Sequence, residues 1–394
     1  MYKIYIDNHL LHAESITEGE YRVLNPALNA ELNRSYRLSF MVPYKHPNYD
    51  RIAIYKPTVT VYDGSQRVYR GRVIASDIDF FKNNLTVCES DIGFLNDVIM
   101  RPYEFAGSIE AYFKKCVHEY NIGADAYRRF GTYSVSGTAT PATNLTAAQI
   151  QAAAISDFVP GVCTVTDPNN YIVRESVQYQ TVYTEMMDKL VGLCGGYLMT
   201  RYENGIDYVD YLVESGVTDN TQTIKFAENL LDLGIGASTD NFYSVIVPIG
   251  AKQENDVPLT IASVNDGKDY LEDATKISAF GRIERVVEWE DVTLASNLKT
   301  KAQAALAASA MYNEITVSAV DMHGFDPAKN RFKVGNKYRL ISYPHGYGVL
   351  SDNLFLLSKA TIAIDNPADS VYTFVRKYVV GAGDKISQMV NRRA

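Results

Sequence analysis

The chain has 394 residues, more than the roughly 250–300 at which a single hydrophobic core stops growing, so two or more domains are expected. Apolar residues make up 46% and charged residues 21% of the chain, a composition typical of globular proteins and not of disordered ones. The formal charge of −8 argues against a protein that binds nucleic acid by neutralising phosphates.

The cysteines and the first residues indicate the cellular setting. Cys88, Cys116, Cys163 and Cys194 form no CxxC pair, which predicts reduced, packed thiols and neither zinc ligands nor disulfides. The first residues lack the positive leader and apolar core of a signal peptide, and no uncharged apolar run approaches roughly 18 residues. We therefore expect a protein that is assembled in a cytoplasm.

Residues 1–95 predict a first antiparallel β-barrel. Strands are expected at residues 2–12, at 34–43 and, as the three strands of a meander, within 58–89. The buried face of the second strand is predicted to carry Leu38, Phe40 and Val42. Asp63-Gly64 and Lys82-Asn83-Asn84 supply the turns of the meander. A meander with one apolar face must curl or pack against another layer, so we expect a closed barrel.

The hydrophobic period then changes, and residues 96–235 are expected to form an inserted α+β domain. A helix is predicted from the N-cap Ser108 to a stop at Asn121-Ile122-Gly123, with Ile109, Phe113, Cys116, Val117 and Tyr120 buried. Residues 131–170 predict an irregular excursion in which 147–155 could form a short helix.

The second half of this insertion predicts a helix and a hairpin. The helix covers about 181–194, with Val182, Met186, Leu190 and Leu193 as its buried stripe and Gly195-Gly196 as its stop. Residues 197–212 predict a hairpin, because Asn204-Gly205 is a strong turn signal between alternating apolar residues.

The remaining chain returns to β structure. Residues 236–265 and 312–380 are expected to form a second barrel, with turns at Gly335-Asn336 and Asp365-Asn366-Pro367. Residues 266–311 predict a small inserted domain whose helix, at 291–311, has Thr293 as a candidate cap and Leu294, Leu298 and Leu306 as its apolar stripe. Residues 381–394 form a C-terminal tail. The fold class is thus mainly β, with two similar antiparallel barrels and two inserted subdomains, a layout compatible with an internal duplication.

No residue pattern predicts a catalytic, cofactor or metal site. Cys116 and His118 lie two apart, which puts them about 200° apart on a helix and prevents a nucleophile–base couple. His323 near Asp321, and His345 near Tyr343, are interpreted as solvated loop residues. The acidic residues around Trp289, which are Glu288, Glu290 and Asp291, predict a wet face, and Asp266-Gly267 predicts a turn and not a calcium loop. Gly381-Ala382-Gly383 is interpreted as a hinge and not a phosphate cradle.

Several short phrases, in order along the chain, carry a resemblance. They are Pro47-Asn48-Tyr49, Gly71-Arg72-Val73, Thr86-Val87-Cys88-Glu89, Phe94-Leu95-Asn96-Asp97, Phe226-Ala227-Glu228-Asn229-Leu230-Leu231, Val247-Pro248-Ile249-Gly250, Thr260-Ile261-Ala262-Ser263-Val264-Asn265-Asp266-Gly267, Asp269-Tyr270-Leu271-Glu272-Asp273, Phe280-Gly281-Arg282-Ile283 and Asp291-Val292-Thr293. Through them the chain resembles the hub proteins of siphophage and prophage tails, the prophage-tail endopeptidase or tail-associated lysin N-terminal family, which is similar to the central hub of T-even baseplates.

This resemblance implies a homotrimer whose six barrels make a ring of pseudo-sixfold symmetry. Its implied partners are the hexameric distal tail protein, the C-terminus of the tape-measure protein and a tail fibre or spike protein, with phage DNA passing through the lumen without specific binding. The implied location is the virion tail tip, after assembly in the host cytoplasm. The implied role is to close or line the tail tube and to gate genome release.

Many relatives are described as endopeptidases or lysins, in which a long extension with a hydrolase or a stalk follows the hub. Here only GAGDKISQMVNRRA follows the last expected strand, with Ile386 and Val390 on one face of a short helix that could seat a spike or fibre. We therefore expect a structural protein and no enzyme. A receptor- or cell-wall-carbohydrate-binding adhesin and a peptidoglycan hydrolase remain as alternatives, and a tailocin or other phage-like particle remains as a variant of the hub.

Overall fold

The computed structural model describes residues 2–13, 20–130, 158–167, 170–253, 257–290, 292–348, 353–366 and 369–377. The predicted short helix at 147–155, the tail at 381–394 and its hinge at Gly381-Ala382-Gly383 lie outside these residues. The chain forms two compact units. Unit 1 comprises Met1–Leu233 with Thr316–Phe374, and unit 2 comprises Gly234–Ile315 with Val375–Ala394.

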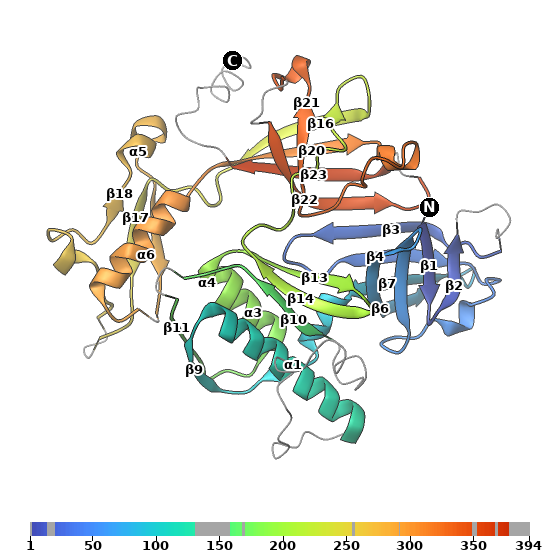
Figure 1. The fold of residues 1–394 in the computed structure, drawn as a ribbon, viewed down its shortest axis with the longest axis horizontal. Helices are drawn as coiled ribbons and strands as arrows, with labels where there is room; N and C mark the ends of the chain where they lie inside the picture. The colour runs from blue at the N-terminus through green and yellow to red at the C-terminus, as the bar shows by residue number, and fades with distance from the viewer. Residues whose placement is uncertain are drawn as a thin grey trace. The chain divides into compact units, whose positions relative to one another are not determined.

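The predicted mainly β class is confirmed, because a sheet of 13 mostly antiparallel strands dominates the structure (Figure 1). Its main path runs in the order β16-β20-β23-β22-β3-β4-β7-β6-β5-β1-β2, and β21 joins β22 and β15 beside it. The strands from the first part of the chain are β1 (Tyr2–Ile6), β2 (His9–Ala13), β3 (Leu24–Glu31), β4 (Arg37–Val42), β5 (Thr58–Asp63), β6 (Gln66–Ile78) and β7 (Asn84–Ser90). Those from the later part are β15 (Ile224–Lys225), β16 (Leu230–Ser238), β20 (Tyr312–Ala319), β21 (Lys337–Ile341), β22 (Leu354–Ala363) and β23 (Val371–Lys377).

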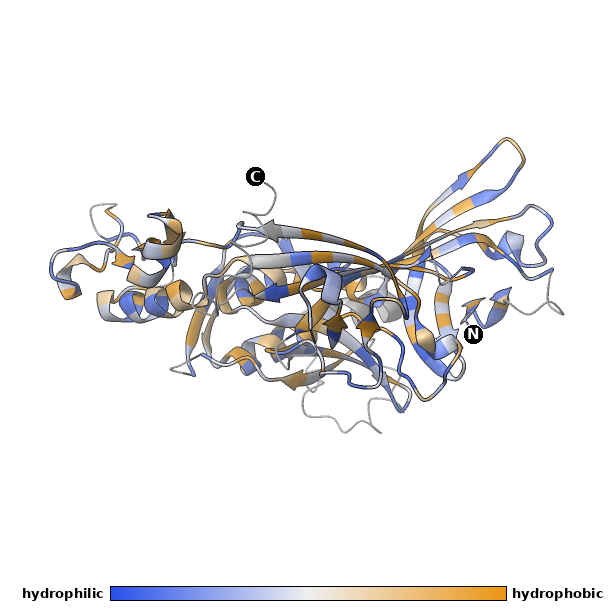
Figure 2. Ribbon diagram, turned by 90° about the horizontal axis from the view of Figure 1, so that it is seen from above, coloured by the Kyte–Doolittle hydropathy of each residue, from blue (hydrophilic) through white to orange (hydrophobic). Residues whose placement is uncertain are grey.

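The strands of the two predicted barrels are continuous with each other. β22 pairs with β3 from Lys359 opposite Glu31 to Ala363 opposite Ala27, so hydrogen bonds join the later strands to the first ones. Hydrophobic and hydrophilic residues alternate along many of these strands (Figure 2), as period-two side-chain geometry requires. Two similar, separate barrels therefore stay a prediction, whereas one large antiparallel sheet is observed.

The predicted meander is confirmed as β5, β6 and β7. Gly64 has a φ of +58° at the first turn, and Lys82 has a φ of +65° at the second. The single strand predicted at 2–12 is instead the hairpin β1–β2, because Asp7 and Asn8 both adopt positive φ and reverse the chain.

The core under this part of the sheet includes the predicted inward residues Leu38, Phe40 and Val42, all buried. β3 was not predicted, because proline and asparagine are uncommon in strands and Pro26 lies between Asn25 and Asn29. Its alternation is nevertheless regular, with Leu28 and Ala30 buried.

The insertion contains helices and short sheets. Its elements are β8 (Ile99–Met100), β9 (Tyr103–Gly107), α1 (Ile109–Phe130), β10 (Val159–Cys163), β11 (Ile172–Ser176), β12 (Gln180–Thr181), α3 (Val182–Met186), a π-helical turn (Met187–Val191), α4 (Gly192–Cys194), β13 (Tyr197–Glu203) and β14 (Ile206–Leu212). β13 and β14 are the predicted hairpin, with Asn204 and Gly205 both at positive φ.

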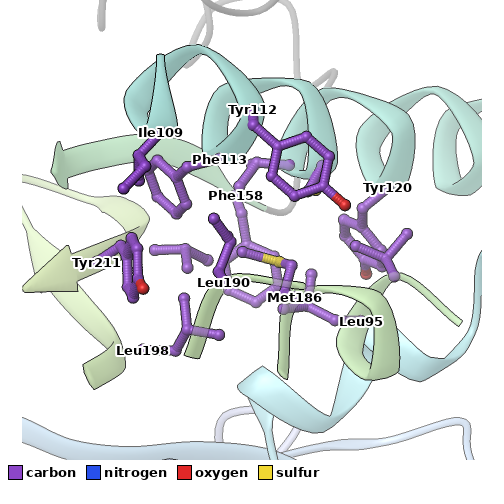
Figure 3. Packing of buried hydrophobic residues seen from close by; sticks show 14 of the residues in the cluster. Leu95, Ile109, Tyr112, Phe113, Tyr120, Phe158, Met186, Leu190, Leu198 and Tyr211 are labelled. Atoms are coloured by element: carbon purple, nitrogen blue, oxygen red, sulfur yellow. The ribbon is translucent and has the colours of Figure 1, made fainter. Parts of the chain in front are cut away.

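The core of the insertion lies beneath α1 (Figure 3). Ser108 caps α1 as predicted, since the amide of Ala111 donates to its hydroxyl at 3.1 Å. The predicted stop at residues 121–123 is wrong, because α1 continues to Phe130. Asn121 is buried inside this helix and donates through its side-chain amide to the carbonyl of Phe158 at 2.7 Å. An asparagine with a tertiary partner does not need to end a helix.

The second predicted helix is interrupted. Thr181 caps it and Gly195, at a φ of +70°, ends it as predicted. Val182, Met186 and Leu190 are buried, but Leu193 is 37% exposed and does not belong to the buried stripe. The π-helical turn at Met187–Val191 widens the helix and rotates the residues after it, which explains this error.

Unit 2 has its own small sheet and core. The elements within it are β17 (Val245–Ile249), β18 (Leu271–Glu272), α5 (Ala274–Phe280), β19 (Glu284–Glu288) and α6 (Ala295–Ala308). β17 pairs with β18 and β19, and not with the large sheet that was expected to contain it.

The core of unit 2 lies between this small sheet and α6. Leu298 and Leu306 of α6 are buried as predicted, but Leu294 is 59% exposed because it is the N-cap residue and not part of the stripe. The helix begins after Leu294, so Thr293 is not its cap. Trp289 is buried in the same core. Among the described residues, no helix is both long and apolar enough to cross a membrane.

Candidate functional site

The densest charged cluster of unit 1 lies where β6 meets the insertion. Arg67 and Arg70 of β6 both donate to the carboxylate of Asp207, which stands just after the Asn204-Gly205 turn on β14. The three side chains are only 11–15% exposed. The guanidinium of Arg67 also lies 3.6 Å from the ring centroid of Tyr202. One carboxylate thus holds two largely buried arginines, and water screens such an interaction poorly.

A third arginine of β6 forms a second contact with the insertion. Arg72 donates to Glu89 at 2.7 Å and to Asp97 at 2.7 Å. Its guanidinium lies 4.7 Å from the ring centroids of both Tyr55 and Phe94. Burial opposes the charged form of Arg72, but the carboxylates of Asp97 and Glu89 outweigh it and raise its pKa. Such stacked, bidentate contacts suit arginine and not lysine.

Glycines allow this close approach. A Cβ on Gly71 would lie 2.1 Å from the carbonyl oxygen of Glu89, and a Cβ on Gly93 would lie 2.8 Å from its carboxylate. Neither position can accept a side chain without displacing the backbone or the Arg72 partner. Two of the phrases that carry the resemblance are thus in contact, since Arg72 of the first touches Phe94 and Asp97 of the second.

A buried acid completes the junction of β6 with the insertion. Asp91 is 5% exposed and accepts a hydrogen bond from the hydroxyl of Thr200 at 2.9 Å. Burial raises the pKa of Asp91, and the nearby charges of Arg70 and Arg67 lower it in part. We call these residues, Arg67, Arg70, Arg72, Glu89, Asp91, Asp97 and Asp207, the β6 junction. It ties the insertion to the large sheet.

The turn of the β5–β6 hairpin is held by the later part of the chain. Asp63 accepts two hydrogen bonds from Arg331, one of them at 3.0 Å. Arg331 also lies 4.5 Å from the ring centroid of Tyr2 and 3.8 Å from the carboxylate of Asp321. Burial would raise the pKa of Asp63, but hydrogen bonds and positive charges, those of Arg331 foremost, lower it to about 2. The sequence separation of 268 residues explains why no local pattern predicted this pair.

Acid should weaken the Asp63–Arg331 contact. The pKa of Asp63 falls from 3.8 to about 2 on folding, so its stabilisation is complete above about pH 4 and is lost as the pH falls toward 2. A shift of this size corresponds to about 2 kcal/mol. We expect the free energy of unfolding of Asp63→Asn to be lower than wild type at pH 7 and to fall less between pH 4 and 2. Urea unfolding at several pH values measures this, with Asp50→Asn at an exposed position as the control. Parallel pH dependence of Asp63→Asn and wild type would contradict it.

The histidines weighed from sequence form hydrogen bonds within their own loops, and each also has a distant contact: Nε2 of His323 lies 4.0 Å from the carboxylate of Asp63, and the ring of His345 lies edge to face with that of Phe226. Asp321, for which a metal site with His323 was considered, accepts hydrogen bonds from the backbone amides of His323 at 3.0 Å and Phe332 at 3.3 Å. The Nδ1 atom of His323 lies 2.6 Å from the carbonyl oxygen of Lys329, and that of His345 lies 2.6 Å from the hydroxyl of Ser342. These contacts shape loops.

The other candidates are also separated. Cys116 is fully buried, and burial raises the pKa of its thiol to about 12, whereas His118 of the same helix is half-buried. Glu288 and Glu290 are exposed on either side of the buried Trp289, and Asp291 lies outside the described residues. Asp266 and Gly267 form a turn, as predicted. In the described part of the chain, no three His, Cys, Asp or Glu side chains are arranged to hold a metal ion.

Comparison with known proteins agrees with the resemblance found in the sequence. Residues 218–358 match the family described as prophage endopeptidase tail. No curated protein sequence matches the chain.

Solved structures of similar fold extend this result to nearly the whole chain. The 43 kDa tail protein of prophage MuSo2 from Shewanella oneidensis is 14% identical, with a TM-score of 0.57 over 97% of this chain and 99% of that one. A tail protein from Neisseria meningitidis is 14% identical, with a TM-score of 0.56 over 96% of each chain. A prophage tail protein from Listeria monocytogenes is 12% identical, with a TM-score of 0.52 over 94% of this chain and 92% of that one.

The resemblance to prophage tail proteins is thus confirmed: residues 218–358 match the prophage tail endopeptidase family, and the chain has the fold of prophage tail proteins along nearly all of its length.

Proposed function

We propose that the chain is a structural hub of a phage tail tip, a homotrimer that closes or lines the end of the tail tube. The observation that carries this proposal is the likeness of nearly the whole chain to prophage tail proteins, which extends beyond a single module. The location is then the virion tail tip, after assembly in the cytoplasm of the bacterial host.

The proposed role is mechanical. The trimer adapts the sixfold distal tail ring to a threefold fibre or spike, contacts the C-terminus of the tape-measure protein and gates genome release. DNA passes through the lumen without specific binding, and a formal charge of −8 is compatible with this because clustered cations would retard a sliding polyanion.

The β6 junction and the Asp63–Arg331 pair support this mechanical role. They tie the insertion and the later strands to the β5–β6 hairpin through largely buried ion pairs. Removing one partner of such a pair leaves an unpaired charge and costs about 3–5 kcal/mol, so these contacts resist separation. A force applied to the insertion would reach the large sheet through them.

We propose further that this chain is not itself a hydrolase, although the description of the matching family names an endopeptidase. The fold neighbours are described as tail proteins, and the buried thiol of Cys116 is a poor nucleophile because its raised pKa disfavours the thiolate. Zymography on purified cell wall tests this. A cleared band that co-migrates with the chain would make it an enzyme.

The first test of the hub is the mass of the purified chain in solution. Light scattering is expected to give three times the chain mass of 44.0 kDa. Mixing with the neighbouring distal tail protein is expected to give a complex of three copies with six. A monomer that does not bind this partner at high concentration would contradict the hub and favour a receptor- or carbohydrate-binding adhesin.

A further inference from the structure

The turn between β6 and β7 exposes two adjacent phenylalanines. Phe80 is 93% exposed and Phe81 is 75% exposed, and their rings contact each other edge to face with centroids 5.3 Å apart. Soluble proteins rarely leave such large apolar groups together in water unless the surface binds a partner.

The turn holds these rings in a defined position. The carboxylate of Asp79 accepts hydrogen bonds from the backbone amide of Asn83 at 2.8 Å and from its side-chain amide at 2.9 Å. The hydroxyl of Tyr49 donates to the carbonyl of Lys82 at 2.7 Å. Because the backbone is already ordered, little conformational entropy remains to be lost when the rings bind. We call Phe80 and Phe81, with this turn, the Phe knob.

A row of apolar residues also crosses the sheet beyond this turn. Leu24, Met41 and Leu85 face one another across β3, β4 and β7, because Leu24 is opposite Met41 and Met41 is opposite Leu85. Leu24 and Leu85 are each 45% exposed.

A second apolar surface lies on β11 and the residues beside it. Tyr171, Val173, Val177 and Tyr179 are 57%, 44%, 84% and 70% exposed, and the exposed Glu175 of β11, opposite Glu104 of β9, lies between Val173 and Val177. Ile172 and Arg174, which alternate along the strand with Tyr171 and Val173, are buried. Among the described strands β11 pairs only with β9, so its other edge has no strand beside it. We call Tyr171, Val173, Val177 and Tyr179 the β11 face; tyrosine in particular is enriched in protein interfaces.

The two surfaces lie on different sides of unit 1. In Figure 1, β9 and β11 are on one side of α1 and α3, and β6 and β7 are on the other. A closed ring with threefold symmetry requires a head-to-tail contact, in which two different surfaces of the chain meet. Unit 1 offers such a pair: one ordered projecting knob, and the β11 face with its four exposed apolar side chains around Glu175.

We propose that in the homotrimer the Phe knob of one copy packs against the β11 face of the next. This rests on the proposed trimeric hub and assigns its subunit contact. The two rings would bury about 300–500 Å² on their own side, which is the apolar centre of a contact that needs about 800 Å² from each partner. Buried aromatic anchors of this kind carry most of the binding energy of an interface.

The variant Phe80→Ser/Phe81→Ser tests the knob. Wild type is expected to be trimeric by light scattering, and the variant is expected to be monomeric at the same concentration, with association weakened at least 100-fold. Circular dichroism checks that both are folded. Phe325→Ser removes a phenylalanine that is 76% exposed outside both surfaces, and it should stay trimeric.

Disulfide trapping tests which surfaces meet. The variants Phe81→Cys and Val177→Cys are mixed under mild oxidation, and we expect a cross-linked dimer from the mixture and none from either variant alone. The wild-type chain, in which Cys88 and Cys116 are buried and Cys163 and Cys194 are half-buried, gives the background.

The outcomes separate this contact from the hub itself. A wild-type monomer would overturn the trimeric hub and the contact with it. A trimer that survives Phe80→Ser/Phe81→Ser would overturn only the contact. If that variant also lost the complex with the distal tail protein, the Phe knob would be assigned to the contact with the distal tail ring. Cross-linking of Phe81→Cys with itself would replace the head-to-tail contact with a symmetric one.

Discussion

Val61→Asp is expected to prevent folding of the large sheet. Val61 is fully buried on β5, opposite Ile4 of β1, in the core that also contains Leu38 and Phe40. An isolated carboxylate in this core costs several kcal/mol even if it is protonated, which is a large part of the roughly 5–15 kcal/mol that stabilises a domain. Circular dichroism and the soluble yield measure the loss of folded protein.

Thr60→Asp is the matched control for this variant. Thr60 is the preceding residue on β5, points to the other face of the sheet and pairs with Arg70. A carboxylate there remains near water and a positive charge, so the fold should persist. A soluble, cooperatively unfolding Val61→Asp protein would show that the inner face of this strand has been misidentified.

Asp207→Ala is expected to produce the second large effect. The substitution leaves Arg67 and Arg70 without their shared carboxylate at a site where all three side chains are 11–15% exposed. The expected loss is about 3–5 kcal/mol in the free energy of unfolding, because two largely buried arginines then lose the carboxylate that both donate to. Faster hydrogen exchange should appear in β13 and β14 before it appears in β5. This order would show that the insertion loosens from β6 while the sheet stays folded.

Glu203→Ala is the matched control for Asp207→Ala. Glu203 lies on the same hairpin and pairs with Arg201, but its side chain is 59% exposed, so its loss should cost less than about 1 kcal/mol. Equal destabilisation by the two substitutions would contradict the importance of burial in the β6 junction.

Local patterns predicted most elements of the large sheet and of the insertion. The meander followed from alternation and from Gly64, and the second hairpin followed from Asn204-Gly205, because a positive φ is a property of the turn residues themselves. Ser108 marked the start of α1 for a similar reason: a helix needs a side-chain acceptor at its first turn.

The errors share a physical cause. Asn121 has the residue type of a helix stop, but its buried bond to Phe158 keeps it inside α1. Leu193 has the spacing of a buried residue, but the π-helical turn before it rotates it outward. In each case a contact or distortion beyond the local pattern outweighs a preference of about 1 kcal/mol or less.

The sequence by itself determined the strand and turn pattern, the buried faces of most strands and the resemblance to tail hub proteins. Hydrogen bonds between neighbouring residues and the φ preferences of single residues act over a few positions. Strands, turns and helix caps can therefore be predicted from the order of residues. Only the tertiary structure decided the pairing of β22 with β3, the separation of β17 into a small sheet, and the partners of Arg70, Arg72 and Arg331. The ion pairs among these contacts join residues that lie 25 to 268 positions apart in the sequence. At such separations no local pattern indicates which carboxylate a given arginine will meet.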